Sequence, residues 1–258
     1  MDSTKSKSSG NSFDVIDGAE AHRGVYRGND LTEAFDSGAF SAHVADGSFR
    51  DIFPGDYITK DVTVSAIVPT EKTFTCNVRF IIADLDVALN RACPVVTAHH
   101  VAIVPQKPPF LSYMNPIDTN KGGYAMSYMN RIVMPAFARV LSDAFGASHL
   151  LKCNSEESGS GIADSESGLC RLMTLSMVFG QKLPAYALSF PDKDKYMDGV
   201  QLAGFKLNPA LQGNGIWYWL SDTDDRTDFA YAGDCSGFHA FAGGASTAIG
   251  VRPFALLI

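Results

Sequence analysis

The chain lacks paired cysteines, clustered basic residues and any long apolar run. Its five cysteines are scattered, with no Cys-x-x-Cys spacing and no histidine at ligand distance, which argues against a zinc site, a redox motif or a disulfide scaffold. Lys and Arg number 21 against 28 Asp and Glu, a net charge of -7 without a basic cluster, so we expect no nucleic-acid partner. No apolar run reaches the roughly 18 to 20 residues that cross a bilayer, so we expect no membrane insertion.

The N-terminus is polar and rich in serine, "MDSTKSKSSGNS", with no apolar segment behind it. It predicts a disordered leader over residues 1–24 and no signal peptide. Residues 25–258 are predicted to form a single α+β domain. The stretch 154–168, rich in Ser, Gly and Glu, is interpreted as a mobile surface loop, with a domain linker as the alternative.

Short strands are predicted to dominate, with two or three helices. Residues 40–58 favour turns and short edge strands over helix. Val62–Val68 and Thr73–Ile82 are rich in β-branched and aromatic residues, and the second alternates apolar with polar side chains, as a half-buried strand does. "HHVAIVP" continues this pattern until Pro105 ends it.

The clearest helix is predicted between Met129 and Phe145, where apolar residues recur every three or four positions. Because proline is tolerated only in a first helical turn, we expect one helical turn up to Val133, a new helix starting near Pro135, and a stop at Gly146. A weaker helical pattern covers Leu169 to Gly180, "LCRLMTLSMVFG".

The last 45 residues, 214–258, read as antiparallel hairpins. "NG" at 214–215 is a turn signal, and "IWYWLS" follows it as a strand. Alternation would place Trp217 and Trp219 on one face and Tyr218 on the other. We interpret both tryptophans as core and Tyr218 as partly exposed; the alternative is that one tryptophan reaches the surface and stacks on a sugar ring.

Ordered landmarks resemble those of a family of phage and prophage proteins. They are "RGNDL", "FRDIFPGDYI", "IIADLDVALN", "AHHVAIVP", "TNKGGYAMSYM", "AFGASHLL" and a C-terminal Tyr-Trp-Leu followed by Gly-Val-Arg-Pro. The resemblance runs from about Tyr26 to Ile258. It implies a C-type-lectin-like architecture in the C-terminal part and a virion protein that contacts a host surface. Ser221 departs from the family, which usually has Arg after Tyr-Trp-Leu, and so does the acidic loop behind it.

The lectin-like scaffold is also the target of diversity-generating retroelements, which rewrite a C-terminal cassette between fixed framework residues. Here the cassette would run from Trp217 to Ala248. The predicted ligand-binding residues are Asp222, Thr223, Asp225, Asp228, Tyr231, Asp234, Ser236 and His239. The predicted structural framework is Trp217, Trp219, Gly250, Arg252 and Pro253.

Two groups of acidic and histidine residues are candidate metal sites, each with a structural alternative. Asp84, Asp86, His99 and His100 could build a metal site, but adjacent histidines in a strand point to opposite faces, so hydrogen bonding at strand ends is the preferred interpretation. Aspartates 222, 224, 225 and 228 could bind calcium, although they lack the sugar-binding lectin signatures and acids in loops are usually solvated. We predict no metal and no cofactor.

Arg252 is interpreted as structural, and the sequence shows no motif of nucleophilic catalysis. Arg252, within an apolar strand, is expected to pair inside the fold, with a loop aspartate as a candidate partner, since a buried arginine without one costs several kcal/mol. No nucleophile elbow or phosphate loop is present. Formylglycine-generating enzymes share the lectin-like scaffold but use a cysteine pair near the C-terminus, where this chain has only Cys235.

The leading hypothesis is a non-enzymatic virion protein, assembled in the host cytoplasm, that attaches to a host-cell surface protein or glycan. One alternative is a purely structural decoration or tail-assembly protein that binds other virion subunits. Another is a retroelement-diversified binding protein. A homo-oligomer is compatible with each of these hypotheses.

Overall fold

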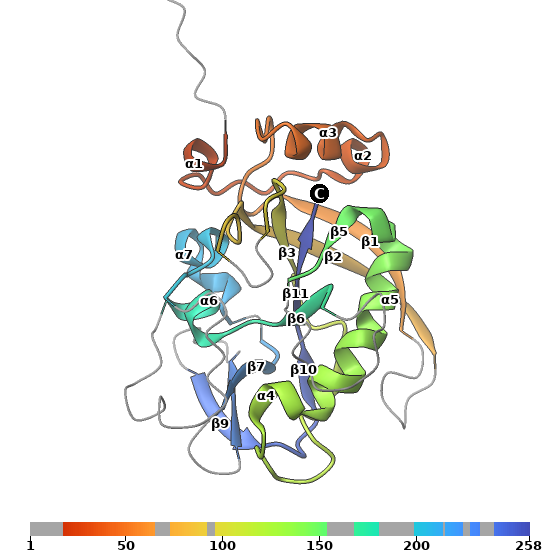
Figure 1. Ribbon diagram of the computed structural model, residues 1–258, viewed down its shortest axis with the longest axis vertical. Coiled ribbons are helices and arrows are strands. Elements are labelled where there is room, and N and C mark those ends of the chain that lie inside the picture. The colour runs from red at the N-terminus through yellow and green to blue at the C-terminus, as the bar shows by residue number, and fades with distance from the viewer. Residues whose placement is uncertain are drawn as a thin grey trace, which may run out of the picture.

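The computed structural model describes eight stretches of the chain, and the following account concerns these alone: 18–64, 73–91, 96–153, 168–180, 199–213, 215–223, 228–232 and 240–258. In them the chain forms a mixed α+β structure with two sheets and short helices around them (Figure 1). The prediction of an α+β fold is confirmed. Residues 1–17 of the expected leader and 154–167 of the expected loop lie outside the described residues.

The larger sheet has six strands and is antiparallel throughout. Its order is β1-β2-β3-β11-β5. On the same edge of β11, β5 pairs with residues 256–257 and β6 pairs with residues 253–255. The strands are β1 (Tyr57–Val64), β2 (Phe74–Leu85), β3 (Val101–Pro105), β5 (Leu150–Leu151), β6 (Cys170–Leu172) and β11 (Pro253–Leu257).

The smaller sheet has five strands in the order β4-β10-β7-β8-β9 and is antiparallel except for the contact between β10 and β7. Its strands are β4 (Phe110–Ser112), β7 (Tyr218–Thr223), β8 (Asp228–Ala232), β9 (Ala240–Gly244) and β10 (Ile249–Val251). Because β10 leads directly into β11, the last ten residues run from one sheet into the other, with Arg252 at the junction (Figure 1).

Short helices pack around the sheets. In the described residues there are seven α-helices, so the expectation of two or three is wrong. They are α1 (Ala19–His22), α2 (Thr32–Asp36), α3 (Ala39–Ala45), α4 (Gly123–Met126), α5 (Met134–Phe145), α6 (Leu175–Phe179) and α7 (Ala203–Leu207), beside the π-helix η1 (Met129–Val133) and the 3-10 turns η2 (Ala147–His149) and η4 (Pro209–Leu211).

The larger sheet is covered on both faces at β3 and β11 and on one face at β1 and the first half of β2. One face packs on α2, α3 and α5, and the other on α6 and α7. Figure 1 shows α5 along one side of the molecule, α6 and α7 along the opposite side, and α1–α3 at the end where β11 finishes. A strand covered on both faces has no polar side, which is why β3 and β11 are apolar along their whole length.

The predicted strands are largely confirmed. In β2 the residues Phe74 to Phe80 alternate between buried or half-buried and exposed positions, and the rest of the strand is buried on both faces. The strand predicted over Val62–Val68 begins earlier, at Tyr57, and its described part ends at Val64. β3 matches its prediction and ends at Pro105.

The main predicted helix is confirmed, including its interruption. η1 covers Met129–Val133 as one wide π turn, and α5 continues from Met134 to Phe145 with Pro135 in its first turn. A proline has no N–H to donate and crowds the carbonyl four residues earlier, so the change of winding at this point relieves both problems. Gly146, at φ 85°, ends the helix.

Two local predictions are wrong. Residues 40–58 were expected to form turns and short edge strands, but Ala39–Ala45 form α3, because Phe40 and Val44, four residues apart, insert together into the core. Leu169–Gly180 was expected to be one helix, yet Cys170–Leu172 form β6 against β11 and only Leu175–Phe179 are helical. Pairing with a buried strand here outweighs local helical preference.

The N-terminal boundary also differs from its prediction. Residues 18–24, expected within the disordered leader, are ordered: Gly18 N–H donates to Ser48 O at 2.9 Å, and His22 is buried. In the described part of the chain, no helix is long and apolar enough to span a bilayer.

Candidate functional site

The predicted ligand-binding residues are only partly within the described chain. Thr223 ends β7 and is half-buried. Asp228 and Tyr231 belong to β8, of which only the backbone is described. The others lie outside the described residues: Asp225, Asp234, Ser236 and His239.

Asp222 is not an exposed reader of a ligand, so its prediction is wrong. Its side chain is buried, and Oδ2 accepts a hydrogen bond of 2.6 Å from the N–H of Leu175, the first residue of α6. The carboxylate therefore satisfies a backbone donor that a helix start leaves unpaired. This contact also engages one of the four aspartates of the calcium alternative.

Trp219 and Tyr218 form the rigid base of β7. Trp219 is fully buried, and its Nε1–H donates to Ser112 O of β4 at 2.9 Å. Tyr218 is also fully buried, contrary to the expected partial exposure, and its hydroxyl donates to Gln212 O at 2.7 Å. Both faces of β7 are covered, so alternation along the strand does not separate core from surface here.

Trp217 was predicted as core, and that prediction is wrong. It precedes the first residue of β7 and is 47% exposed. Its backbone is nevertheless fixed, since Gly250 N–H donates to Trp217 O at 2.8 Å. A large aromatic side chain is therefore presented to solvent from an ordered backbone.

Two exposed aliphatic residues come from the same part of the smaller sheet. Ile216 precedes Trp217 and is 37% exposed, and Leu111, at the edge strand β4, is 45% exposed and pairs in register with Gly250. We call Leu111, Ile216 and Trp217 the Trp217 edge. These residues belong to or adjoin β4 and β7, strands of the smaller sheet, which lies in the lower half of the molecule, away from α1–α3 (Figure 1).

Gly250, predicted as framework, lies in close contact with the Trp217 backbone and with Pro108. A Cβ atom placed there would lie 2.6 Å from Trp217 O and 2.6 Å from Pro108 Cγ. Real Cβ contacts are longer, so the close approach of β10 to the Trp217 backbone needs a residue without a side chain. Pro253, the other small framework residue, is buried in β11 opposite Leu172.

Arg252 is fully buried, and its hydrogen-bond partners among the described residues are backbone carbonyls. The side chains of Asp224, Asp225 and Asp228 lie outside what the structure describes, so the expected pairing with a loop aspartate stays a prediction. In the described residues, Nε donates to Pro105 O and Nη1 to Leu211 O, both at 2.8 Å, while Nη2 has no partner there. The guanidinium lies 5.1 Å from the ring centroid of Phe205 and 5.0 Å from that of Tyr218. Burial lowers the pKa of Arg252. Through its bond to Leu211 O, Arg252 fixes the chain a few residues before Trp217.

The two adjacent histidines do not converge on one site. His99 Nδ1 lies 2.7 Å from Asp86 Oδ2, while its Nε2 faces the backbone turn at Gly47. His100 is buried: Nδ1 pairs with Ala98 O, and Nε2 accepts from Ala88 N–H, so its ring is neutral. Burial lowers the pKa of His100. In the described chain these side chains hydrogen-bond strand ends, the interpretation that the sequence favoured.

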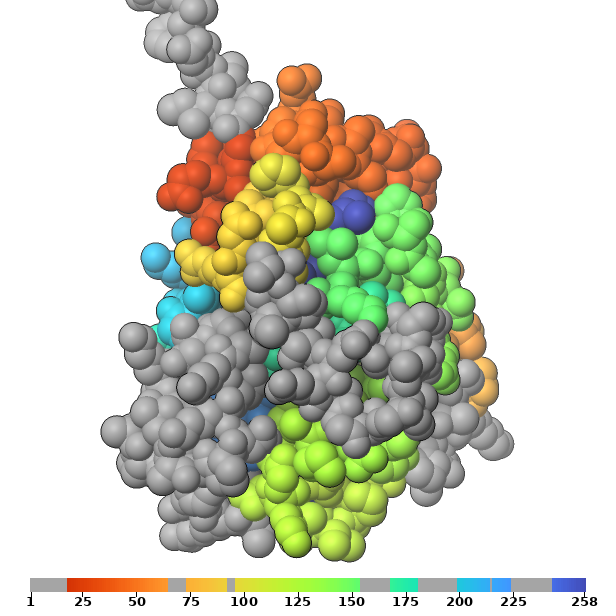
Figure 2. Space-filling view, viewed as in Figure 1, coloured from red at the N-terminus to blue at the C-terminus, as the bar shows by residue number. Residues whose placement is uncertain are grey.

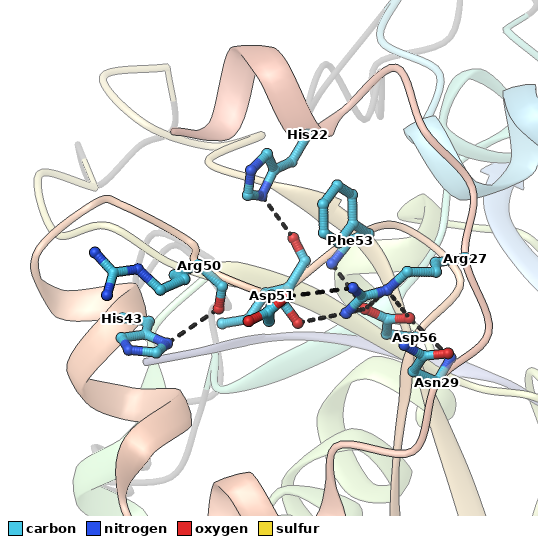
Figure 3. A network of polar contacts seen from close by, with 9 residues as sticks. His22, Arg27, Asn29, His43, Arg50, Asp51, Phe53 and Asp56 are labelled. Carbon is cyan, nitrogen blue, oxygen red and sulfur yellow. Dashed lines mark hydrogen bonds and ion pairs between the residues drawn. The ribbon is translucent and has the colours of Figure 1, made fainter. Parts of the chain in front are cut away.

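A polar network at the opposite end was not predicted (Figure 3). The fully buried carboxylate of Asp56 accepts from Arg27 Nη2 at 2.7 Å, from Asn29 N–H at 2.8 Å and from Phe53 N–H at 2.9 Å. The Arg27 guanidinium also lies 4.3 Å from the centroid of the Phe53 ring, which stacks on His22. This network joins the quoted landmarks "RGNDL" and "FPGDYI".

A second buried carboxylate anchors the same segment. Asp84 accepts from Arg23 Nε at 2.6 Å and from Ala203 N–H, the first residue of α7, at 3.0 Å. Burial raises the pKa of Asp84, against the effect of Arg23. The signal available in the sequence was two Arg-Gly pairs four residues apart, at 23–24 and 27–28. Both carboxylates are enclosed, so this network stabilises the fold and offers no ligand site.

No known protein family, no curated protein and no solved structure matches this chain.

Proposed function

We propose that the protein is a non-enzymatic phage or prophage virion protein that binds a host-cell surface molecule through the Trp217 edge. The ordered landmarks from Tyr26 to Ile258 support the virion assignment and a C-type-lectin-like organisation of the C-terminal hairpins. The observation that carries the binding site is the 47% exposure of Trp217 on a backbone fixed by Gly250.

The Trp217 side chain is pre-organised for binding. An exposed tryptophan offers about 150–250 Å² of contact area with few rotatable bonds, so binding through it costs little side-chain entropy. The backbone beneath it is fixed at Trp217 O, Gln212 O and Leu211 O by bonds from Gly250, Tyr218 and Arg252.

The alternative of a purely structural virion component uses the same surface for another subunit. A direct test is binding of the labelled full chain to a panel of bacterial cells and to an array of bacterial glycans. We expect binding to at least one of these probes and a loss of at least about tenfold in Trp217→Ala, because exposed aromatic anchors dominate such contacts.

The matched control is Tyr26→Ala, which removes an aromatic side chain that is 37% exposed near the opposite end. Binding should be unchanged in this variant. If the full chain binds no cell and no glycan, or if Trp217→Ala binds as well as the parent, the proposal is wrong.

A further inference from the structure

The strands β1 and β2 extend beyond the rest of the larger sheet. Because β2 pairs with β3 only from Phe80 onward, residues 60–64 of β1 and 74–78 of β2 have only each other as strand neighbours in the described chain. The buried side of this two-stranded ribbon packs on α5. In Figure 2 its light-orange atoms reach the right-hand rim of the molecule, beside the green atoms of α5.

Hydrogen bonds at the start of β1 show which of its backbone groups face away from β2. Tyr57 N–H donates to Asn29 O at 3.0 Å, and Tyr57 O accepts from Leu31 N–H at 2.8 Å. In an antiparallel pair, backbone groups face alternately toward and away from the partner strand. The odd-numbered residues of β1 therefore direct their N–H and C=O groups to its outer edge.

The first part of this outer edge is covered and the second part is open. Thr59 N–H donates to Thr32 Oγ1 at 2.9 Å. The next outward residues are Asp61 and Thr63, whose backbone N–H and C=O groups have no partner among the described residues. We call residues 61–63 the β1 edge. Such a row of unpaired backbone groups is a template for another extended strand.

The exposed side chains of the β1 edge complement each other. Asp61 Oδ1 accepts from Asn77 Nδ2 at 2.8 Å, whereas Oδ2 has no partner in the described part of the chain. The hydroxyls of Thr63 and Thr75 lie 2.9 Å apart and share one hydrogen bond. The edge thus carries a carboxylate oxygen that lacks a donor and, two residues further on, a hydroxyl that can supply one.

We propose that two copies of this chain associate by antiparallel pairing of their β1 edges, with Val62 of both copies on the two-fold axis. Asp61 of each copy then lies opposite Thr63 of the other, so the two pairs exchange four backbone hydrogen bonds. In the same register the Thr63 hydroxyl donates to Asp61 Oδ2. Two-fold contacts in which one surface serves both copies are the commonest in homo-oligomers.

The neighbouring two-fold register is disfavoured. Centred on Asp61, it would place two carboxylates directly opposite each other, which is destabilising in a sheet. It would also require Thr59 N–H, which already donates to Thr32 Oγ1. The contacts within one copy therefore select the register centred on Val62.

Sedimentation velocity of the full chain over a range of concentrations tests the proposal with two proline variants. The parent should show a concentration-dependent dimer. Asp61→Pro removes an outward N–H from each copy and leaves the bonds to β2 in place, so it should weaken the dimer at least about tenfold.

Asn77→Pro is the matched control. It loses the same side-chain bond between Asn77 and Asp61, but its backbone N–H faces the opposite edge of the ribbon, since the neighbouring outward group Arg79 O accepts from Gln106 N–H. The dimer should change less than about twofold in this variant. Circular dichroism verifies that each variant folds, and Thr63→Pro, which removes the other outward donor, replaces Asp61→Pro if that variant does not.

A parent protein that is monomeric at every concentration would overturn the proposal and leave the β1 edge to a strand of another protein. Equal dimerisation of the β1-edge and Asn77 proline variants would overturn it as well. Cell and glycan binding through Trp217 is read out separately, so neither proposal depends on the other.

Discussion

Gly250→Ala tests whether the Trp217 edge depends on the close approach of β10. The added methyl group would meet Trp217 O and Pro108 Cγ, each at 2.6 Å, about 0.8 Å inside the ordinary contact range. A backbone oxygen cannot rotate away, so β10 and the Trp217 backbone must separate. Overpacking of this kind costs about 1–3 kcal/mol. Part of that cost is the hydrogen bond of 2.8 Å from Gly250 N–H to Trp217 O.

The assay is thermal and urea unfolding followed by tryptophan fluorescence. A loss of about 2 kcal/mol corresponds to a fall in Tm of about 4–8 °C for a chain of this size. Gly28→Ala is the control, because a Cβ there meets nothing within 4 Å and its φ is not in the left-handed region. That variant should match the parent or be slightly more stable. If Gly250→Ala unfolds at the parent midpoint, the packing argument fails.

Three further predictions concern the buried groups. Asp56→Ala should lower the free energy of unfolding by about 2–4 kcal/mol in urea titrations, because it leaves the partly buried Arg27 guanidinium and the N–H groups of Asn29 and Phe53 without their acceptor. Asp51→Asn, at a side chain 83% exposed, should change it little. Equal effects of the two variants would contradict the network. His100 stays neutral in the folded protein, whereas in the unfolded chain it takes up a proton near pH 6.5, so the free energy of unfolding should fall as the pH drops below about 6.5. His100→Gln should reduce this dependence on pH by up to about 1.4 kcal/mol per pH unit. An unchanged pH dependence in the variant would refute this. Trp219→Phe loses the bond to Ser112 O and should cost about 1–2 kcal/mol while the chain remains folded, which chemical denaturation can measure; a cost near zero would show that this bond does not support β7.

The sequence predicted elements whose side chains follow one simple period. β2 alternates where only one of its faces is covered, and α5 has an apolar stripe with a proline where its winding changes. It did not predict β6, a three-residue strand defined by its pairing with β11. Pairing partners more than eighty residues away leave no trace in a local pattern.

At the candidate site, too, a local sequence pattern did not reveal which residues distant segments would cover. Gly250 was predicted as framework from the resemblance and Trp219 from the aromatic pattern, and the structure places both residues in buried positions. Trp217 was assigned to the core by alternation, but whether a residue is covered depends on where the neighbouring strands end. Asp222 appeared to belong to a solvated acidic loop, and only its distance to Leu175 N reveals a helix start.

The most direct test of the account is the accessibility of the two tryptophans, measured with single-tryptophan variants. Iodide should strongly quench the fluorescence of Trp217 in Trp219→Phe and barely quench that of Trp219 in Trp217→Phe, given exposures of 47% and 0%. Adding bacterial envelope fragments that bind the chain should protect Trp217 from quenching. A Trp217 as shielded as Trp219 in the free chain, or equally quenched in the bound one, would contradict the claim that this side chain is presented to a host ligand.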